Sequence, residues 1–230
     1  MTRIRGVPKA VLILIVALSI VSAGCGSDEK GAMPTTPPDL GRDVLGAFVD
    51  AAADGKAETM WNLLSKPSQR RAGPTLAEFE NRTFPGLRRT LAPFAEGKLP
   101  VQVSERLDGR FGLVALSRGR HAYATPLRHE GNVWRVELPG ALRLDTLRPP
   151  PDSRGKFLNQ LAVESHGPGG AGFALLYLDG VTLEPKTYSG PKSATVFANF
   201  ENSLEPGQHT AVAFVRTGNS AAARAWTFAP

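Results

Sequence analysis

Two side chains with the chemistry of an acid–base pair, His121 and Tyr123, lie two residues apart in a segment typical of a β-strand. Residues two apart on a strand share a face, so this imidazole and phenol could act together as a proton-transfer group and a hydrogen-bond donor. No acidic residue on the same short segment could orient His121. We therefore interpret both as ordinary strand residues, with a pocket containing His121, Tyr123 and Arg135 as the alternative.

Three further ionisable residues of the same region have structural explanations. Asp108 precedes Gly109 in a pattern typical of a hairpin turn, where an Asp side chain accepts hydrogen bonds from the backbone. His129 and Glu130 lie at the tip of a second predicted hairpin, where side chains are solvated. We assign none of them a catalytic role and expect the chain not to be an enzyme.

Two short motifs match catalytic signatures but have the wrong surroundings. Gly167–Gly172 fits the G-x-G-x-x-G pattern, yet a strand-like run follows it where a dinucleotide site needs a helix. The Ser-x-x-Lys pattern occurs in predicted linkers and loops without its companion motifs. A single cysteine and four histidines without zinc-type spacing predict no metal site. The sequence therefore predicts no cofactor.

The chain is basic, with a net charge of +6, and several arginines gather near one predicted hairpin. Arg118, Arg120 and Arg128 flank the predicted strand that contains His121. We interpret them as a solvated face. The alternative is a patch that attracts anions such as lipid headgroups or acidic wall polymers.

The N-terminus has the three parts of a secretory signal. They are a basic start (Arg3, Arg5, Lys9), a short apolar run (Val11–Val21) and small residues (Ser22, Ala23, Gly24) before the lone cysteine, Cys25. The apolar run is too short for a membrane-spanning helix, which needs about 20 residues. The segment predicts export, so we expect an extracytoplasmic protein and no nucleic acid partner.

The sequence Ala23-Gly24-Cys25 resembles the lipobox of bacterial lipoproteins. The resemblance implies cleavage after Gly24, removal of residues 1–24 as a signal peptide, and fatty acylation of Cys25. Two acyl chains are enough for stable membrane anchoring. Residues 25–38 are polar and rich in Gly, Pro and Thr, and they predict a flexible tether between the lipid and a folded body.

The region 39–148 changes its apolar period part-way along. An apolar stripe over 40–52 predicts an amphipathic helix, 56–65 predicts a second that ends at Pro67, and a capping-box pattern at Thr75–Glu78 opens a third. After Pro100 the period becomes two, which predicts about four antiparallel strands. Helices followed by a meander indicate an α+β domain.

This order of elements, ending in Gly131-Asn132-Val133-Trp134-Arg135-Val136, is similar to the nuclear-transport-factor-two-like (cystatin-like superfamily) fold. The resemblance implies three N-terminal helices packed on a curved antiparallel sheet, which forms a cone with an apolar pocket. Members of that family include enzymes, binding modules and scaffolds, so the resemblance alone does not give a function.

Three consecutive prolines, residues 149–151, predict a stiff hinge before a region of different character. Residues 152–230 contain short apolar runs separated by Gly, Pro, Asn and Asp, which predicts an all-β sandwich. The segments Pro206–Thr210 and Trp226-Thr227-Phe228 resemble those of a bacterial immunoglobulin-like domain. The resemblance implies a spacer or an adhesive module.

Together these patterns predict a membrane-anchored envelope lipoprotein that acts as a non-catalytic binding module. Its expected partners are the membrane, through lipidated Cys25, and an envelope protein, a wall polymer or a small apolar ligand. One alternative is a carrier or enzyme that uses the cone pocket. Another is a structural spacer.

Overall fold

The computed structural model describes residues 40–154, 159–167, 171–190, 192–200 and 204–230. The predicted signal peptide and the whole of the predicted tether, including Cys25, lie outside the described residues. All described residues belong to one compact unit, residues 37–230.

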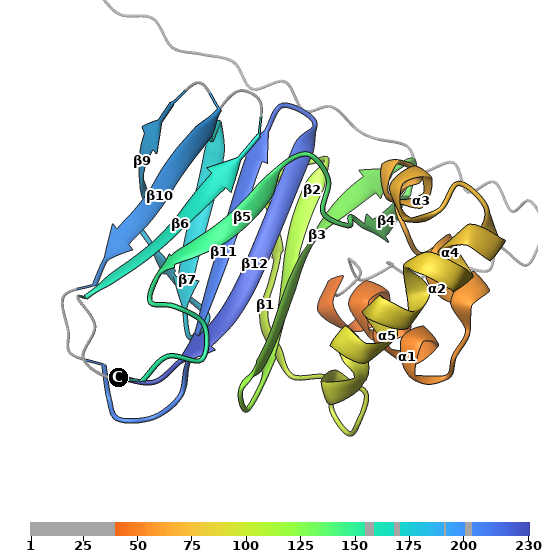
Figure 1. Cartoon of the computed structure of the whole chain (residues 1–230), viewed down its shortest axis with the longest axis horizontal. Helices are drawn as coiled ribbons and strands as arrows, with labels where there is room; N and C mark the ends of the chain where they lie inside the picture. The colour runs from red at the N-terminus through yellow and green to blue at the C-terminus, as the bar shows by residue number, and fades with distance from the viewer. Residues whose placement is uncertain (1–39, 155–158, 168–170, 191, 201–203) are drawn as a thin grey trace, which may run out of the picture. The chain divides into compact units, whose positions relative to one another are not determined.

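Short helices make up the N-terminal part of the described chain (Figure 1). They are a π-helical segment Leu40–Gly46, α1 (Ala47–Ala53), α2 (Ala57–Asn62), α3 (Lys66–Ala72), α4 (Leu76–Arg82), α5 (Phe84–Leu91) and a 3₁₀ turn Ala92–Phe94. The capping box predicted at Thr75 is confirmed. The Thr75 hydroxyl accepts from the Glu78 N–H, and the Glu78 carboxylate accepts from the Thr75 N–H. The prediction that Pro67 ends a helix is wrong: Pro67 lies in the first turn of α3 after the Ser65 N-cap, where proline loses no helical hydrogen bond.

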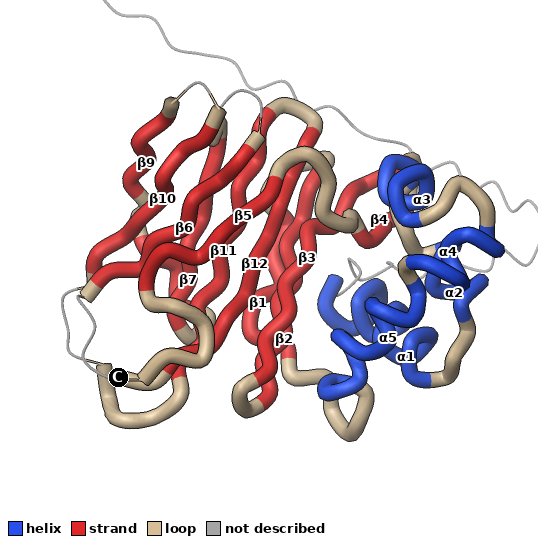
Figure 2. Tube along the Cα trace, viewed as in Figure 1, coloured by secondary structure: helices blue, strands red, loops and turns tan. Residues whose placement is uncertain are grey.

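Strands make up the rest and form three antiparallel sheets (Figure 2). The first is the meander β1 (Val101–Arg106), β2 (Phe111–Arg118), β3 (His121–Glu130) and β4 (Val133–Val136). The second has the order β5 (Arg143–Arg148), β6 (Gln160–His166), β10 (Ser193–Asn199) and β9 (Lys186–Ser189). The third has the order β12 (Ser220–Phe228), β11 (His209–Thr217), β7 (Phe173–Leu178) and β8 (Val181–Leu183).

The second and third sheets form the predicted β-sandwich. With strands β5 to β12 named A, B, C, C′, D, E, F and G, the two sheets read ABED and GFCC′. That is the strand order of an immunoglobulin-like fold. Their facing sides share an apolar core that includes Leu161, Val163 and Val196 from one sheet and Ala213 and Trp226 from the other.

The predicted boundary between the two regions, after residue 148, is wrong, because the sandwich already begins with β5. The sequence pattern assigns residues 143–148 to the first domain, but β5 pairs antiparallel with β6 and is strand A of the sandwich. Leu142 and Leu144 explain this placement, because both are buried in the sandwich core. The segment predicted as a hinge is also fixed, since the Asp152 N–H donates to the Thr227 carbonyl at 2.8 Å.

The meander sheet lies between the helices and the sandwich. One face carries Val114, Leu116, Leu127 and Val136 into a core shared with the helices. The opposite face carries Val103, Phe111, Leu113 and Ala115 into a core shared with Tyr177, Val212, Phe214 and Ala221 of the third sheet. The described residues therefore form four layers: helices, the β1–β4 sheet, the β7–β8–β11–β12 sheet and the β5–β6–β9–β10 sheet.

Two strands, β2 and β11, are buried on both faces as a result. All residues of Phe111–Leu116 and of Thr210–Val215 are buried. This explains why their sequences are nearly unbroken apolar runs rather than alternating ones. The same contact joins the two predicted domains into one body.

We expect Phe214→Ala to lower the free energy of unfolding by about 3–5 kcal/mol, because it empties space in the core between β2 and β11. Urea unfolding should remain a single transition, with the helical circular dichroism signal and tryptophan fluorescence changing together. Val181→Ala, at a side chain that is 66% exposed, is the control and should change stability little. Separate transitions for the two signals would contradict a shared core.

Candidate functional site

The structure does not bring the predicted pocket residues together. His121 is exposed at the start of β3, whereas Tyr123 packs against the helical core. Burial raises the pKa of Tyr123 to about 12, so its phenol stays protonated at neutral pH. Arg135 donates a short hydrogen bond to the Asn62 carbonyl and lines a different cavity, beside α2 and α3.

The helix-facing side of the β1–β4 sheet, where the resemblance implied an apolar pocket, is occupied by side chains. Phe48 and Met60 are 0% exposed and Leu64 is 1% exposed. Trp61 is half-buried beside them, and its indole N–H donates to the Gly73 carbonyl at 3.3 Å. This packing favours a structural core over a ligand cavity on that face.

Arg128 lies apart from Arg118 and Arg120, the other two arginines of the predicted anion patch. Arg118 lies opposite His121 at one end of the β2–β3 hairpin, and Arg128 lies opposite Phe111 at the other end, about 23 Å away along the strand. Arg118 donates to the Pro93 and Lys98 carbonyls at 3.1 and 2.8 Å. Arg120, in the turn between β2 and β3, lines a cleft together with His121.

Asp108, His129 and Glu130, which the sequence assigns to turns, each contact neighbouring elements of the fold. The Asp108 carboxylate accepts from the Arg110 and Phe111 N–H groups at 2.7 and 2.8 Å and pairs with Arg216 of β11. Burial alone would raise the pKa of Asp108, but these backbone donors and the charge of Arg216 hold it below its ordinary value.

His129 and Glu130 support the neighbouring elements. The His129 ring stacks on Trp134 with 4.8 Å between centroids. The Glu130 carboxylate accepts from the Lys66 N–H at 3.0 and 3.2 Å and so caps the start of α3. Both residues therefore fix the end of the β3–β4 hairpin against its surroundings.

A buried carboxylate, Glu137, joins elements from both halves of the body. Its side chain is 4% exposed and pairs with Arg128 at 2.8 Å and Arg71 at 3.1 Å. Ser65, the cap of α3, donates a short hydrogen bond to the same carboxylate. Arg128 also donates to the Asn219 carbonyl, in the β11–β12 turn, at 2.6 Å. Sequence reasoning missed this network; its one signal is a charge inside the apolar run Val136-Glu137-Leu138.

Burial alone would raise the pKa of Glu137, but the hydrogen bonds from Arg128 and Ser65 and the charge of Arg128 lower it below 4.5. A carboxylate whose pKa is lower in the folded state stabilises the fold above its unfolded pKa. That stabilisation is lost as the pH falls through the folded value.

We expect Glu137→Gln to lower the free energy of unfolding by about 3–5 kcal/mol at neutral pH, because Arg71 and Arg128 lose their buried counter-charge. The difference from the wild type should shrink below the folded pKa of Glu137, where the wild-type carboxyl is protonated. Urea unfolding at several pH values measures both effects. Glu96→Gln, at an exposed position, is the matched control, and an equal loss there would contradict the assignment.

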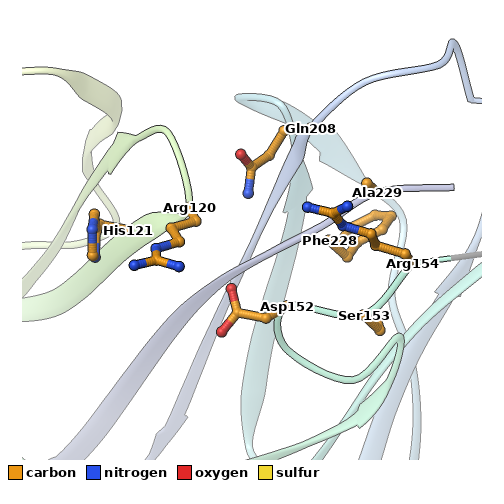
Figure 3. A pocket seen from close by; sticks show the side chains of 8 residues that line it. All are labelled: Arg120, His121, Asp152, Ser153, Arg154, Gln208, Phe228 and Ala229. Carbon is orange, nitrogen blue, oxygen red and sulfur yellow. The ribbon is translucent and has the colours of Figure 1, made fainter.

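A cleft of about 870 Å³ collects residues from segments far apart in the sequence (Figure 3). The lining residues are Arg120, His121, Asp152, Ser153, Arg154, Gln208, Phe228 and Ala229. Arg120 and His121 lie on one side of the cleft and Arg154 on the other, with Asp152 and Gln208 between them. His121 lies at the edge, so one residue of the predicted pocket and one of the predicted patch meet at this cleft.

The walls of the cleft are fixed by the end of β12. The Thr227 hydroxyl donates to the Arg120 carbonyl at 3.0 Å, and the Thr227 carbonyl accepts from the Asp152 N–H at 2.8 Å. The next residues along, Ser153 and Ala229, are joined by a backbone hydrogen bond of 2.9 Å. Thr227 is 2% exposed, so these bonds are shielded from water.

His209 fixes the wall that carries Gln208. Its Nδ1 lies 2.6 Å from Asp179 and its Nε2 lies 2.8 Å from the Glu205 carbonyl, while its ring rests against Phe228 at the cleft floor. Burial alone would lower the pKa of His209, but the hydrogen bonds to Asp179 and Glu205 and the charge of Asp179 raise it above 6.5. Because the pKa of His209 is higher in the folded state, the protonated imidazole stabilises the fold at pH values below the pKa of the unfolded chain. That stabilisation is lost as the pH rises through the pKa of the folded state.

We expect His209→Gln to lower the free energy of unfolding more at about pH 5.5 than at about pH 9, because only the protonated imidazole gains the full interaction with Asp179. Urea unfolding at the two pH values measures the difference. His121→Gln, at an exposed imidazole, is the control. A loss for His209→Gln that is larger at the higher pH would contradict the assignment.

Sequence reasoning could not assemble this cleft. Asp152 and Arg154 follow the predicted hinge, and Gln208 lies in a segment that was interpreted only as an immunoglobulin-like turn. Arg120 and His121 of the β2–β3 hairpin meet them because the sandwich packs on the β1–β4 sheet. Asp152 adopts a left-handed backbone with φ of 56°, which an Asp tolerates better than most residues.

Comparisons with known proteins give no family for the chain. No family model matches, and no curated protein matches. Among solved structures, the crystal structure of Dpr2 Ig1-Ig2 in complex with DIP-Theta Ig1-Ig3 is similar at 11% identity and a TM-score of 0.28. The match covers 46% of this chain and 39% of that one. Among the described residues, no helix has the length and apolar character needed to cross a membrane.

Proposed function

We propose that the chain is a non-catalytic binding module, tethered outside the cytoplasm to a membrane by a lipid on Cys25. The observation that carries the binding role is the cleft at Arg120, Asp152, Arg154 and Gln208, whose walls are fixed by Thr227 and His209. A concave polar site with immobilised walls is suited to bind a ligand, because little order is lost on binding.

The separation of His121, Tyr123 and Arg135 argues against the alternative of an enzyme or carrier in the helix-facing pocket. A proton-transfer pair must lie within hydrogen-bond reach of one substrate. In this fold Tyr123 lies in the helical core, and His121 and Arg135 line different cavities. The order of helices and the β1-β2-β3-β4 meander supports a relationship of this part of the chain, without β5, to nuclear-transport-factor-two-like domains.

The packing of the sandwich argues against an interchangeable spacer. An unrelated sandwich could not replace it, because Val212 and Phe214 of β11 complete the core under Phe111 and Leu113 of β2. The polar lining of the cleft favours a polar partner over the small apolar ligand that the sequence also allowed.

We expect a fatty-acid analogue supplied to the native host to label the wild-type chain, and Cys25→Ala to abolish both labelling and membrane association. Ser27→Ala is the matched control and should be labelled like the wild type. Full labelling of Cys25→Ala, or an unprocessed chain dissolved in the cytoplasm, would overturn the tethering part of the proposal.

A further inference from the structure

The cleft of Figure 3 holds two guanidinium groups that have no side-chain partner among the described residues. Within the part of the chain that the structure describes, neither the Arg120 nor the Arg154 side chain forms an ion pair or a hydrogen bond. Most other arginines around the joint between the sheets are engaged, as Arg128 with Glu137 and Arg216 with Asp108 show. Two unpaired guanidinium groups at one cleft can bind a carboxylate or a phosphate through charge-assisted hydrogen bonds.

The remaining polar groups of the cleft fit a ligand that is more than an anion. Asp152 offers a carboxylate that accepts hydrogen bonds, and Gln208 offers both a donor and an acceptor. A densely charged polyanion would be repelled by Asp152, whereas hydroxyl groups beside a single anionic group would donate to it.

The dimensions and the rigidity of the cleft favour a small ligand over a flat surface. Its volume of about 870 Å³ falls within the range of small-molecule sites. Thr227 sets the position of the Arg120 and Asp152 backbones relative to each other, and His209 sets the wall of Gln208. A membrane surface cannot enter such a concave site, while one or two sugar rings can.

We propose that this cleft binds an anionic sugar, meaning a sugar acid or a sugar phosphate. Arg120 and Arg154 hold the anionic group, and Asp152 and Gln208 receive the hydroxyl groups. The inference rests on the proposed binding function and names its ligand class. It gives Arg120 and Arg154 a shared role that neither the predicted hairpin patch nor the predicted cone pocket contained.

Calorimetric titration of the full chain, in a detergent that contains neither sugar nor phosphate, tests the proposal. The probes are glucuronate, glucose 6-phosphate, neutral glucose and inorganic phosphate. We expect at least one of the two anionic sugars to bind about tenfold more tightly than both glucose and inorganic phosphate. A preference for glucuronate identifies a sugar acid, and a preference for glucose 6-phosphate identifies a sugar phosphate.

Substitutions locate the site. Arg120→Gln and Arg154→Gln should each weaken binding of the preferred sugar about tenfold, whereas Arg89→Gln, which removes the same charge from the exposed side of α5, should not. Asp152→Asn should reduce the preference for the sugar over inorganic phosphate, because it replaces a charged acceptor of hydroxyl groups by a weaker neutral one and removes the repulsion of phosphate. Asn also tolerates the left-handed backbone at this position.

Equal binding of glucose and the anionic sugars, no binding of either anionic sugar, or unchanged affinity in Arg120→Gln and Arg154→Gln would overturn the inference. None of these results bears on acylation of Cys25. Loss of lipid labelling with intact sugar binding would in turn remove the tether and leave the cleft assignment in place.

Discussion

The contact between β2 and β11 is the constraint on which the rest of the described structure depends. Each strand lies in the middle of a sheet that is covered on both faces, so each had to be apolar along its whole length. Around this apolar contact, polar bonds set the register: Ser117 with Thr210 at 2.6 Å, Tyr177 with Glu105 at 2.6 Å, and Arg216 with Asp108. The outer side of one sheet of an immunoglobulin-like sandwich usually faces solvent. In this chain the outer side of the β7–β8–β11–β12 sheet packs on the β1–β4 sheet, so the sandwich is part of a four-layer body.

The cleft is a consequence of that contact. Arg120 comes from the β2–β3 turn, whereas Asp152, Arg154 and Gln208 come from the sandwich, and Thr227 holds the two sides together through one hydroxyl and one carbonyl. Charges elsewhere at the joint are neutralised by buried or half-buried partners, with Glu137 as the clearest case. Because Arg120 and Arg154 have no such partner among the described residues, the cleft keeps the positive charge on which the proposed ligand site depends.

Local patterns in the sequence predicted much of the fold and little of the site. The period-two segments after Pro100, the capping box at Thr75 and the short strands of the sandwich all have local causes, and the structure contains them. The placement of β5 and the start of α3 at Pro67 depend on distant partners, namely the sandwich core and the cap provided by Ser65 and Glu130. Arg118, Arg120 and Arg128 are close in sequence, but an extended hairpin separates its ends, so proximity along the chain gave the wrong cluster.

Native-state hydrogen exchange of the backbone amides of β2 and β11 tests the central claim most directly. If the two strands share one core, their slowest amides should exchange through the same global unfolding event and give equal free energies of opening. They should also lose the same amount of protection as urea is added. Protection of β11 that persists after β2 has become exchangeable would mean that the sandwich folds independently, which would contradict a single core shared by the two strands.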